Sequence, residues 1–171
     1  LIDEAVNCKV DAIKFQTLKT ELVIRKDCPR PSHEIKNLKE KISHFDLVKK
    51  WELKFSDFEK LKKYCEKKKI IFFSTPGDLD SAKFLINLKC PILKIASADM
   101  MNFPMLQTIG KSRLPLILST GMSKWEEIKK SVNFFLKFNK KLIILKCTSN
   151  YPASNESLNL NGILRFKKHF K

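Results

Sequence analysis

Long hydrophobic runs are absent from this 171-residue sequence, and no stretch approaches the roughly 18 apolar residues of a membrane-spanning helix. The amino-terminal residues also lack the pattern of a secretory signal peptide. Metal-binding patterns are absent too, because the five cysteines form no C-x-x-C pair and the three histidines are scattered. We therefore expect a cytoplasmic protein with free thiols, no metal site within this chain and no membrane partner. The residues concerned are Cys8, Cys28, Cys65, Cys90, Cys147, His33, His44 and His169.

Acidic residues are few beside the basic ones. The 18 aspartates and glutamates stand against 34 lysines and arginines, which gives a formal net charge of +16. Such a charge would suit a protein that binds nucleic acid. The lysines, however, are spread over every predicted helix, and no zinc-finger or RNA-binding motif accompanies them. We therefore expect no nucleic-acid partner, while a non-catalytic, basic phosphate- or nucleic-acid-binding domain stays open as an alternative.

Short apolar runs alternate with amphipathic helical patterns through most of the chain. Continuously apolar strands are typical of parallel sheets, in which the intervening helices supply the crossovers. Ser56 is predicted to cap one helix, and Ser123 with Glu126 is predicted to form a capping box for another. Two prolines exclude a continuous helix from the long polar segment 18–53. We expect five strands, beginning near Asp11, Ile70, Pro91, Pro115 and Leu142.

This alternation predicts an α/β fold, and a (β/α)8 TIM barrel fits it best. A complete barrel needs about 250 residues, so the chain is long enough for only part of one. A doubly wound open sheet would show the same alternation and is the alternative. The absence of a G-x-G-x-x-G loop after the first strand counts against it. The opening residues already have the pattern of a helix in progress, so we expect a segment to precede Leu1.

Polar side chains gather where the predicted strands end, and in a barrel these ends meet on the face that holds the active site. Lys14 and Lys94 lie inside apolar strands, where a charge is costly unless it reaches an anion. The small hydroxyl residues at the strand ends could individually be helix caps. Together with two lysines they form a receptor for a ligand with two anionic ends, such as a phosphate and a carboxylate. These hydroxyl residues are Thr17, Ser74, Thr75, Ser97, Ser119, Thr120, Thr148 and Ser149.

Five short strings then carry a resemblance: A-I-K-F-Q-T, F-F-S-T-P, K-I-A-S-A-D, L-S-T-G-M and C-T-S-N-Y-P occur in this order. They resemble the sialic acid synthase family, which includes N-acetylneuraminate synthase and its relatives for legionaminic acid, pseudaminic acid and spore-coat polysaccharide. The resemblance implies that phosphoenolpyruvate condenses with N-acetylmannosamine or a related 2-acetamido sugar to give a nine-carbon 2-keto sugar acid and phosphate. It also implies a divalent metal, manganese or magnesium, that activates the sugar aldehyde, and a homodimer of the full-length enzyme.

The same resemblance assigns roles to residues of this chain. Gln16 and Asp99 are expected near the sugar as the candidate catalytic groups. Lys14 and Lys94 are expected to bind phosphoenolpyruvate. The remaining groups that would line its pocket are Thr75, Ser97, Ser119, Ser149 and Tyr151.

Parts of the family's pattern have no counterpart in this sequence. The first-strand string E-I-G-x-N-H, the S-D-H string whose histidine helps to hold the metal, and the carboxy-terminal antifreeze-like domain are absent. We therefore expect residues 1–171 to form a single partial barrel of about strands two to six, inactive alone and without a metal ligand. The alternative enzyme, another phosphoenolpyruvate-dependent synthase of 3-deoxy-keto acids, would need extra arginines for a second phosphate, and the sequence has only four arginines.

Overall fold

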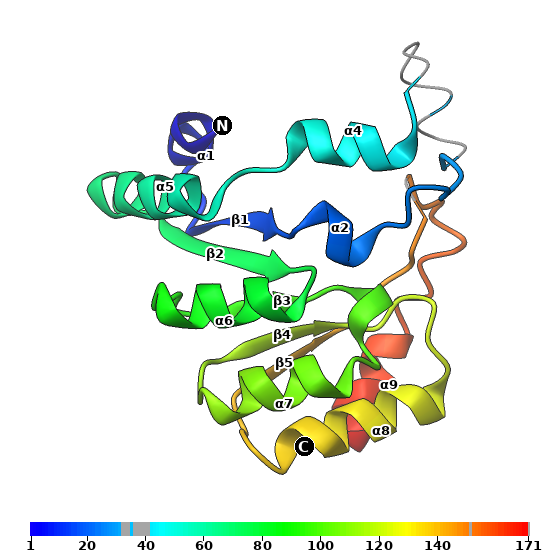
Figure 1. The fold of residues 1–171 in the computed structure, drawn as a ribbon. Helices are drawn as coiled ribbons and strands as arrows, with labels where there is room; N and C mark the ends of the chain where they lie inside the picture. Colours follow the sequence, from blue (N-terminus) through cyan, green and yellow to red (C-terminus); the bar gives the residue numbers. More distant parts are fainter. Residues whose placement is uncertain (32–34, 36–41, 151, 171) are drawn as a thin grey trace.

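The computed structural model describes residues 1–31, 35, 42–150 and 152–170 of the chain. Within these residues, five parallel strands lie side by side in one sheet (Figure 1). Each strand begins within two residues of the predicted position, so the five expected strands are confirmed. They are β1 (Ala12–Thr17), β2 (Ile71–Pro76), β3 (Leu93–Ile95), β4 (Leu116–Ser119) and β5 (Leu142–Leu145).

The order of the strands separates the two predicted folds. In a doubly wound sheet the strand order reverses at a switch point, and helices cover both faces. Here each strand pairs with the strand that precedes it in the chain, and the order is β1-β2-β3-β4-β5 without a reversal. This order is that of consecutive strands in a (β/α)8 barrel. The partial barrel is therefore confirmed, and the doubly wound alternative is wrong.

Helices connect the strands and cover one face of the sheet (Figure 1). α5 and α6 contact β2, and α7 packs between α6 and α8. No helix in the described ranges is both long enough and apolar enough to cross a bilayer. The helices whose bounds lie within the described residues are α1 (Ile2–Asn7), α2 (Thr20–Val23), α4 (His44–Trp51), α5 (Phe55–Lys67), α6 (Leu79–Asn87), the 3-10 helix η1 (Ser97–Asp99), α7 (Phe103–Lys111), α8 (Trp125–Leu136) and α9 (Gly162–His169).

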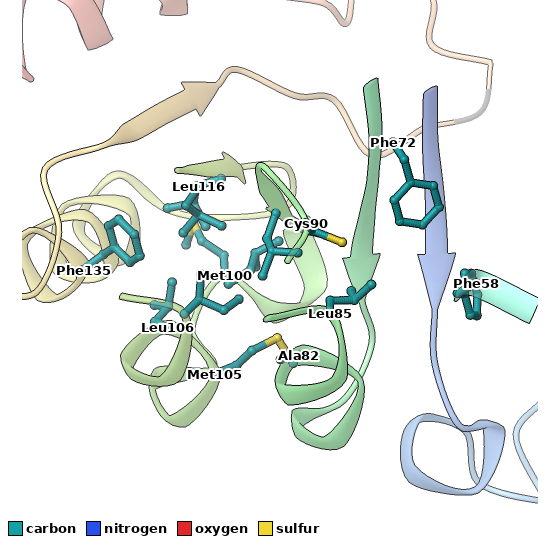
Figure 2. Close-up of a cluster of buried hydrophobic side chains, with 14 of the residues drawn as sticks. Phe58, Phe72, Ala82, Leu85, Cys90, Met100, Met105, Leu106, Leu116 and Phe135 are labelled. Atoms are coloured by element: carbon teal, nitrogen blue, oxygen red, sulfur yellow. The ribbon is translucent and has the colours of Figure 1, made fainter. Parts of the chain in front are cut away.

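The two faces of the sheet differ in what covers them. On the helix side, Leu93 and Leu116 are fully buried, and Figure 2 shows Leu116 and the α6 residue Leu85 in one cluster of buried side chains. On the opposite face, which we call the inner face, Ile71 and Ile143 keep 49% and 51% of their surface exposed. The hydrophobic core of the described residues therefore lies between the sheet and the helices, and the inner face is open.

The turns that lead from helices into strands contain basic residues where many proteins have glycine. Glycine commonly occupies the left-handed position after a helix, because it has no Cβ to clash. In this chain basic residues take that position at four such turns, and the sequence has only four glycines in total. A side chain in the left-handed region costs about 1–2 kcal/mol, so these turns are destabilising by themselves. The residues are Lys9 (φ 56°), Lys69 (φ 59°), Lys89 (φ 58°) and Arg113 (φ 63°).

The predicted helix caps are wrong by one or two residues. Ser56 lies inside α5, whose N-cap is Lys54, and the capping box of α8 uses Lys124 and Glu127 in place of Ser123 and Glu126. In α8 the backbone N–H of Lys124 donates to the Glu127 carboxylate at 2.6 Å. The acidic residue three positions after the cap therefore decides where these helices begin, whereas the serine hydroxyls do not.

In the described part of the polar segment 18–53, a single carboxylate joins α2 and α4. Glu52 accepts hydrogen bonds from the backbone N–H and the hydroxyl of Thr20, at 2.7 and 2.6 Å, and from the Lys49 ammonium at 2.9 Å. Burial acts to raise the pKa of Glu52, but these hydrogen bonds outweigh it and lower the pKa to about 2. The Glu52 carboxylate thus connects α2 and α4 through hydrogen bonds to Thr20 and Lys49.

Candidate functional site

A cavity of about 760 Å³ opens at the carboxyl ends of the strands, on the inner face. All four parallel strand pairs direct their ends to this side of the molecule, which explains why residues far apart in the sequence meet there. The structure brings seven of the predicted site residues together in the lining of this cavity. They are Lys14, Gln16, Thr75, Lys94, Ser97, Ser119 and Ser149.

Two lysine side chains supply the positive charge of this cavity. Lys14 pairs with Phe73 in the register of β1 and β2, and Lys94 pairs with Ile117 in the register of β3 and β4. Among the residues that the structure describes, neither ammonium forms an ion pair with a carboxylate. Burial lowers the pKa of both lysines, and the charge of Lys94 lowers that of Lys14 further. An anion in the cavity would relieve this repulsion and stabilise both charged forms.

The strand-end hydroxyls fall into two groups, because neighbouring residues of a strand point to opposite faces. The Ser74 and Thr17 hydroxyls face the helices and hydrogen-bond to each other at 2.8 Å, and Thr120 donates to the Leu145 carbonyl at 2.8 Å. These three residues are structural. The hydroxyl residues that line the cavity are Thr75, Ser97, Ser119, Thr148 and Ser149.

Thr75 is the hydroxyl residue with the clearest need for a ligand. Its side chain is 4% exposed, and its Oγ1 has no hydrogen-bond partner among the described residues. A buried hydroxyl without a partner costs about 1–3 kcal/mol. Thr75 lines the cavity beside Lys14 and Lys94. The hydroxyl is therefore available to donate to an anionic ligand held between the two lysines.

Gly121 holds Ser97 in place and lies close to Ser149, and the sequence analysis did not identify it. Its backbone N–H donates to the Ser97 hydroxyl oxygen at 2.9 Å. A Cβ on Gly121 would lie 2.9 Å from Ser97 Oγ and closer still to Ser149 Oγ, so any larger residue would displace these hydroxyls. Because the Ser97 oxygen already accepts this bond, its own hydrogen stays free to donate into the cavity. The available signal was one of only four glycines, placed directly after the Ser119-Thr120 strand end.

Asp99 lies outside the lysine-lined cavity. It lines an adjoining cavity of about 800 Å³, which shares Gln16 and Thr75 with the first. Burial raises the pKa of Asp99, and the nearby charge of Asp78 raises it as well, while a hydrogen bond with Asn102 acts in the opposite direction. Asp99 therefore holds its proton to a higher pH than an exposed aspartate does.

Three further predictions concern Tyr151, the arginines and a metal site. Tyr151 and His33 lie outside the described residues. None of the four arginines lines either cavity, which gives no support to a site for a second phosphate. Among the described residues, no group of three or more histidine, cysteine, aspartate or glutamate side chains could hold a metal ion. The polar groups in the lysine-lined cavity are mainly ammonium and hydroxyl groups, which do not fit a divalent metal.

Known proteins resemble this chain over its full length but are about twice as long. Residues 1–171 match the NeuB family. The N,N'-diacetyllegionaminic acid synthase of Legionella pneumophila is 32% identical over 176 residues, which cover 100% of this chain and 49% of that protein. The crystal structure of N-acetylneuraminic acid (sialic acid) synthetase from Leptospira borgpetersenii in complex with citrate has a TM-score of 0.84 and 35% identity, covering 99% of this chain and 54% of that one.

A third similarity concerns the fold alone. The phospho-2-dehydro-3-deoxyheptonate aldolase of Thermotoga maritima has a TM-score of 0.68 at 15% identity, covering 98% of this chain and 42% of that one. The chain spans about half the length of the curated relatives that it matches. The match to the family, in contrast, runs over every residue of the sequence, as the five strings predicted. This chain belongs to the NeuB family.

Proposed function

We propose that this chain forms the phosphoenolpyruvate-binding part of a sugar-acid synthase of the sialic acid type. One observation carries the proposal: a single cavity is lined by two lysines and a buried hydroxyl for which the described residues supply neither ion pairs nor, for the hydroxyl, a hydrogen-bond partner. Phosphoenolpyruvate has a phosphate and a carboxylate, so each lysine can neutralise one end of the ligand. The similarity to legionaminic acid and sialic acid synthases supports a synthase.

In the proposed reaction, C3 of phosphoenolpyruvate forms a bond to the aldehyde carbon of a 2-acetamido sugar, such as N-acetylmannosamine. A water oxygen adds at C2, the bond from C2 to the phosphate oxygen breaks, and phosphate leaves as the 2-keto group forms. Thr75, Ser97 and Ser119 would donate to the ligand's oxygens. Asp99 lies in the adjoining cavity, where its raised pKa suits it to give a proton to the aldehyde oxygen.

For the full-length enzyme we also propose a divalent metal, manganese or magnesium, and a homodimer. We propose that the ligands of this metal come from outside residues 1–171. The 171-residue chain is then expected to bind phosphoenolpyruvate and to release no phosphate when N-acetylmannosamine and manganese are added. Phosphate release above background would contradict the expected inactivity.

Calorimetric titration of the chain with phosphoenolpyruvate tests the binding proposal. Lys94→Ala should weaken binding by about a hundredfold, since it removes a charge-assisted contact worth about 1.5–3 kcal/mol. Lys83→Ala on the exposed surface of α6 is the matched control and should leave the affinity unchanged. Equal affinity in the Lys94→Ala variant and the wild type would reject the site. Salt-sensitive DNA binding that ignores Lys94→Ala would favour the nucleic-acid alternative.

A further inference from the structure

Lys146 follows β5 and joins this strand to the segment that precedes α9. Its ammonium donates to the Leu158 carbonyl at 2.7 Å and to the Thr148 hydroxyl at 3.1 Å. The Thr148 hydroxyl donates in turn to the Ser157 carbonyl at 3.0 Å. These three hydrogen bonds connect the end of β5 with residues about ten positions further along the chain.

The methylene stem of Lys146 adds a packing contact to the same connection. A Cβ on Gly162, the first residue of α9, would lie 3.2 Å from the Cγ and 3.4 Å from the Cε of Lys146. The backbone at the start of α9 therefore packs closely against the lysine stem, and a Cβ there would require the stem to shift by a few tenths of an ångström. Lys146 thus contacts the strand end, the following segment and the next helix at once.

Lys146 is half-buried, and no ion pair in the described ranges joins it to a carboxylate. Its charge is satisfied by a carbonyl and a hydroxyl instead. Hydrogen bonds from a charged donor are roughly twice as strong as neutral ones, so they can hold a short exposed segment in one conformation. The next three residues, Cys147, Thr148 and Ser149, all line the lysine-lined cavity. The contacts of Lys146 thus border directly on the wall of the cavity.

We propose that Lys146 is a positioning residue for the anion site. It fixes Thr148, Ser157 and Leu158 beside the end of β5 and so holds the Ser149 hydroxyl over Gly121, where it can reach the ligand. Lys146 itself does not line the cavity, so it acts through Ser149 and does not bind the anion. This inference rests on the proposed phosphoenolpyruvate site.

A double-mutant cycle tests the inference in the 171-residue chain. Lys146→Met keeps the stem that packs on Gly162 but removes the donors, and it should weaken phosphoenolpyruvate binding by about tenfold. In a Ser149→Ala background the same substitution should weaken binding by less than about twofold, because the residue it positions is gone. Lys146→Arg, which keeps a cationic donor, should restore most of the affinity. An equal loss in both backgrounds would show general destabilisation and overturn the inference.

Hydrogen exchange without ligand keeps this result separate from the proposed function. Lys146→Met and Thr148→Val should both speed amide exchange in residues 148–158, while exchange in α6 and α7 stays as in the wild type. Unchanged exchange in residues 148–158 would overturn the positioning role even if phosphoenolpyruvate binds. If the wild type fails to bind phosphoenolpyruvate while exchange rises as expected, the proposed function fails and the fastening of the segment stands.

Discussion

The helix-covered face and the inner face of the sheet are built from alternate residues of the same five strands, yet they follow different rules. On the covered face, even the polar groups are paired, as the hydrogen bond between Ser74 and Thr17 shows. On the inner face, among the described residues, Thr75 Oγ1 has no hydrogen-bond partner and neither Lys14 nor Lys94 forms an ion pair with a carboxylate. One face therefore stabilises the fold, and the other keeps unsatisfied groups for a ligand.

The largest expected difference between the faces concerns apolar side chains. Leu85→Ala should destabilise the protein by about 2–5 kcal/mol, because Leu85 is fully buried and the substitution leaves a cavity. Ile143→Ala on the inner face should cost less than about 1 kcal/mol, since half of this side chain is already exposed. Urea denaturation of both variants measures the difference. Equal losses would mean that something covers the inner face in solution.

Glu52 lines a cavity together with the inner-face residue Gln16, but its carboxylate accepts hydrogen bonds from Thr20 and Lys49. Glu52→Gln should cost about 1–2 kcal/mol at pH 7, because charge-assisted bonds from Thr20 and Lys49 are lost. The folded-state pKa is about 2 against an ordinary value of 4.5, so the stabilisation is complete above pH 4.5 and declines as the pH falls toward 2. Urea midpoints of the wild type and the variant should therefore converge over this range. The exposed Glu126→Gln is the control and should change stability by less than about 0.5 kcal/mol.

Thr75→Val tests whether the unpartnered hydroxyl serves the ligand or the fold. The substitution replaces a buried hydroxyl that lacks a partner, so stability should stay equal or rise by about 1 kcal/mol. Affinity for phosphoenolpyruvate should fall by about tenfold in the same variant, because one donor is lost. Thermal unfolding and calorimetric titration give the two values. A clear loss of stability would assign Thr75 to the fold instead.

The smallest expected effect lies far from either face, at the left-handed turns. Lys69→Gly should stabilise the protein by about 0.5 kcal/mol, since relief of the left-handed side chain exceeds the added entropy of glycine in the unfolded chain. Lys63→Gly in the exposed middle of α5 should instead destabilise by about 1 kcal/mol. Opposite signs for the same substitution in urea denaturation would isolate the backbone conformation as the cause.

The strands and most helices were predictable because they depend on local patterns of apolar residues. The helix caps were placed wrongly because Asp57 and Glu127 act from inside the helix, three residues after the cap. The helices of segment 18–53 depend on a contact between Thr20 and Glu52, which no local pattern reveals.

The candidate site was predictable as a set of residues but not as a geometry. The strand ends identified the lysines and hydroxyls, but which hydroxyl faces the cavity depends on the pleat, and this divides Thr75 from its neighbour Ser74. The role of Gly121 required the distance to Ser97, 24 positions away in the sequence. Asp99 belongs to an adjoining cavity because η1 carries it past the end of β3.

The strict chain order of the strands has a consequence for synthesis on the ribosome. Each strand from β2 to β5 can pair as soon as it emerges, because the described strand that precedes it in the sheet is already present. The pairing of β1 with β2 closes the longest loop, around segment 18–53, and each later pairing closes a much shorter one. Since loop closure costs entropy that grows with loop length, the first pairing should be the slow step of folding. The sheet would then grow quickly along a single advancing edge.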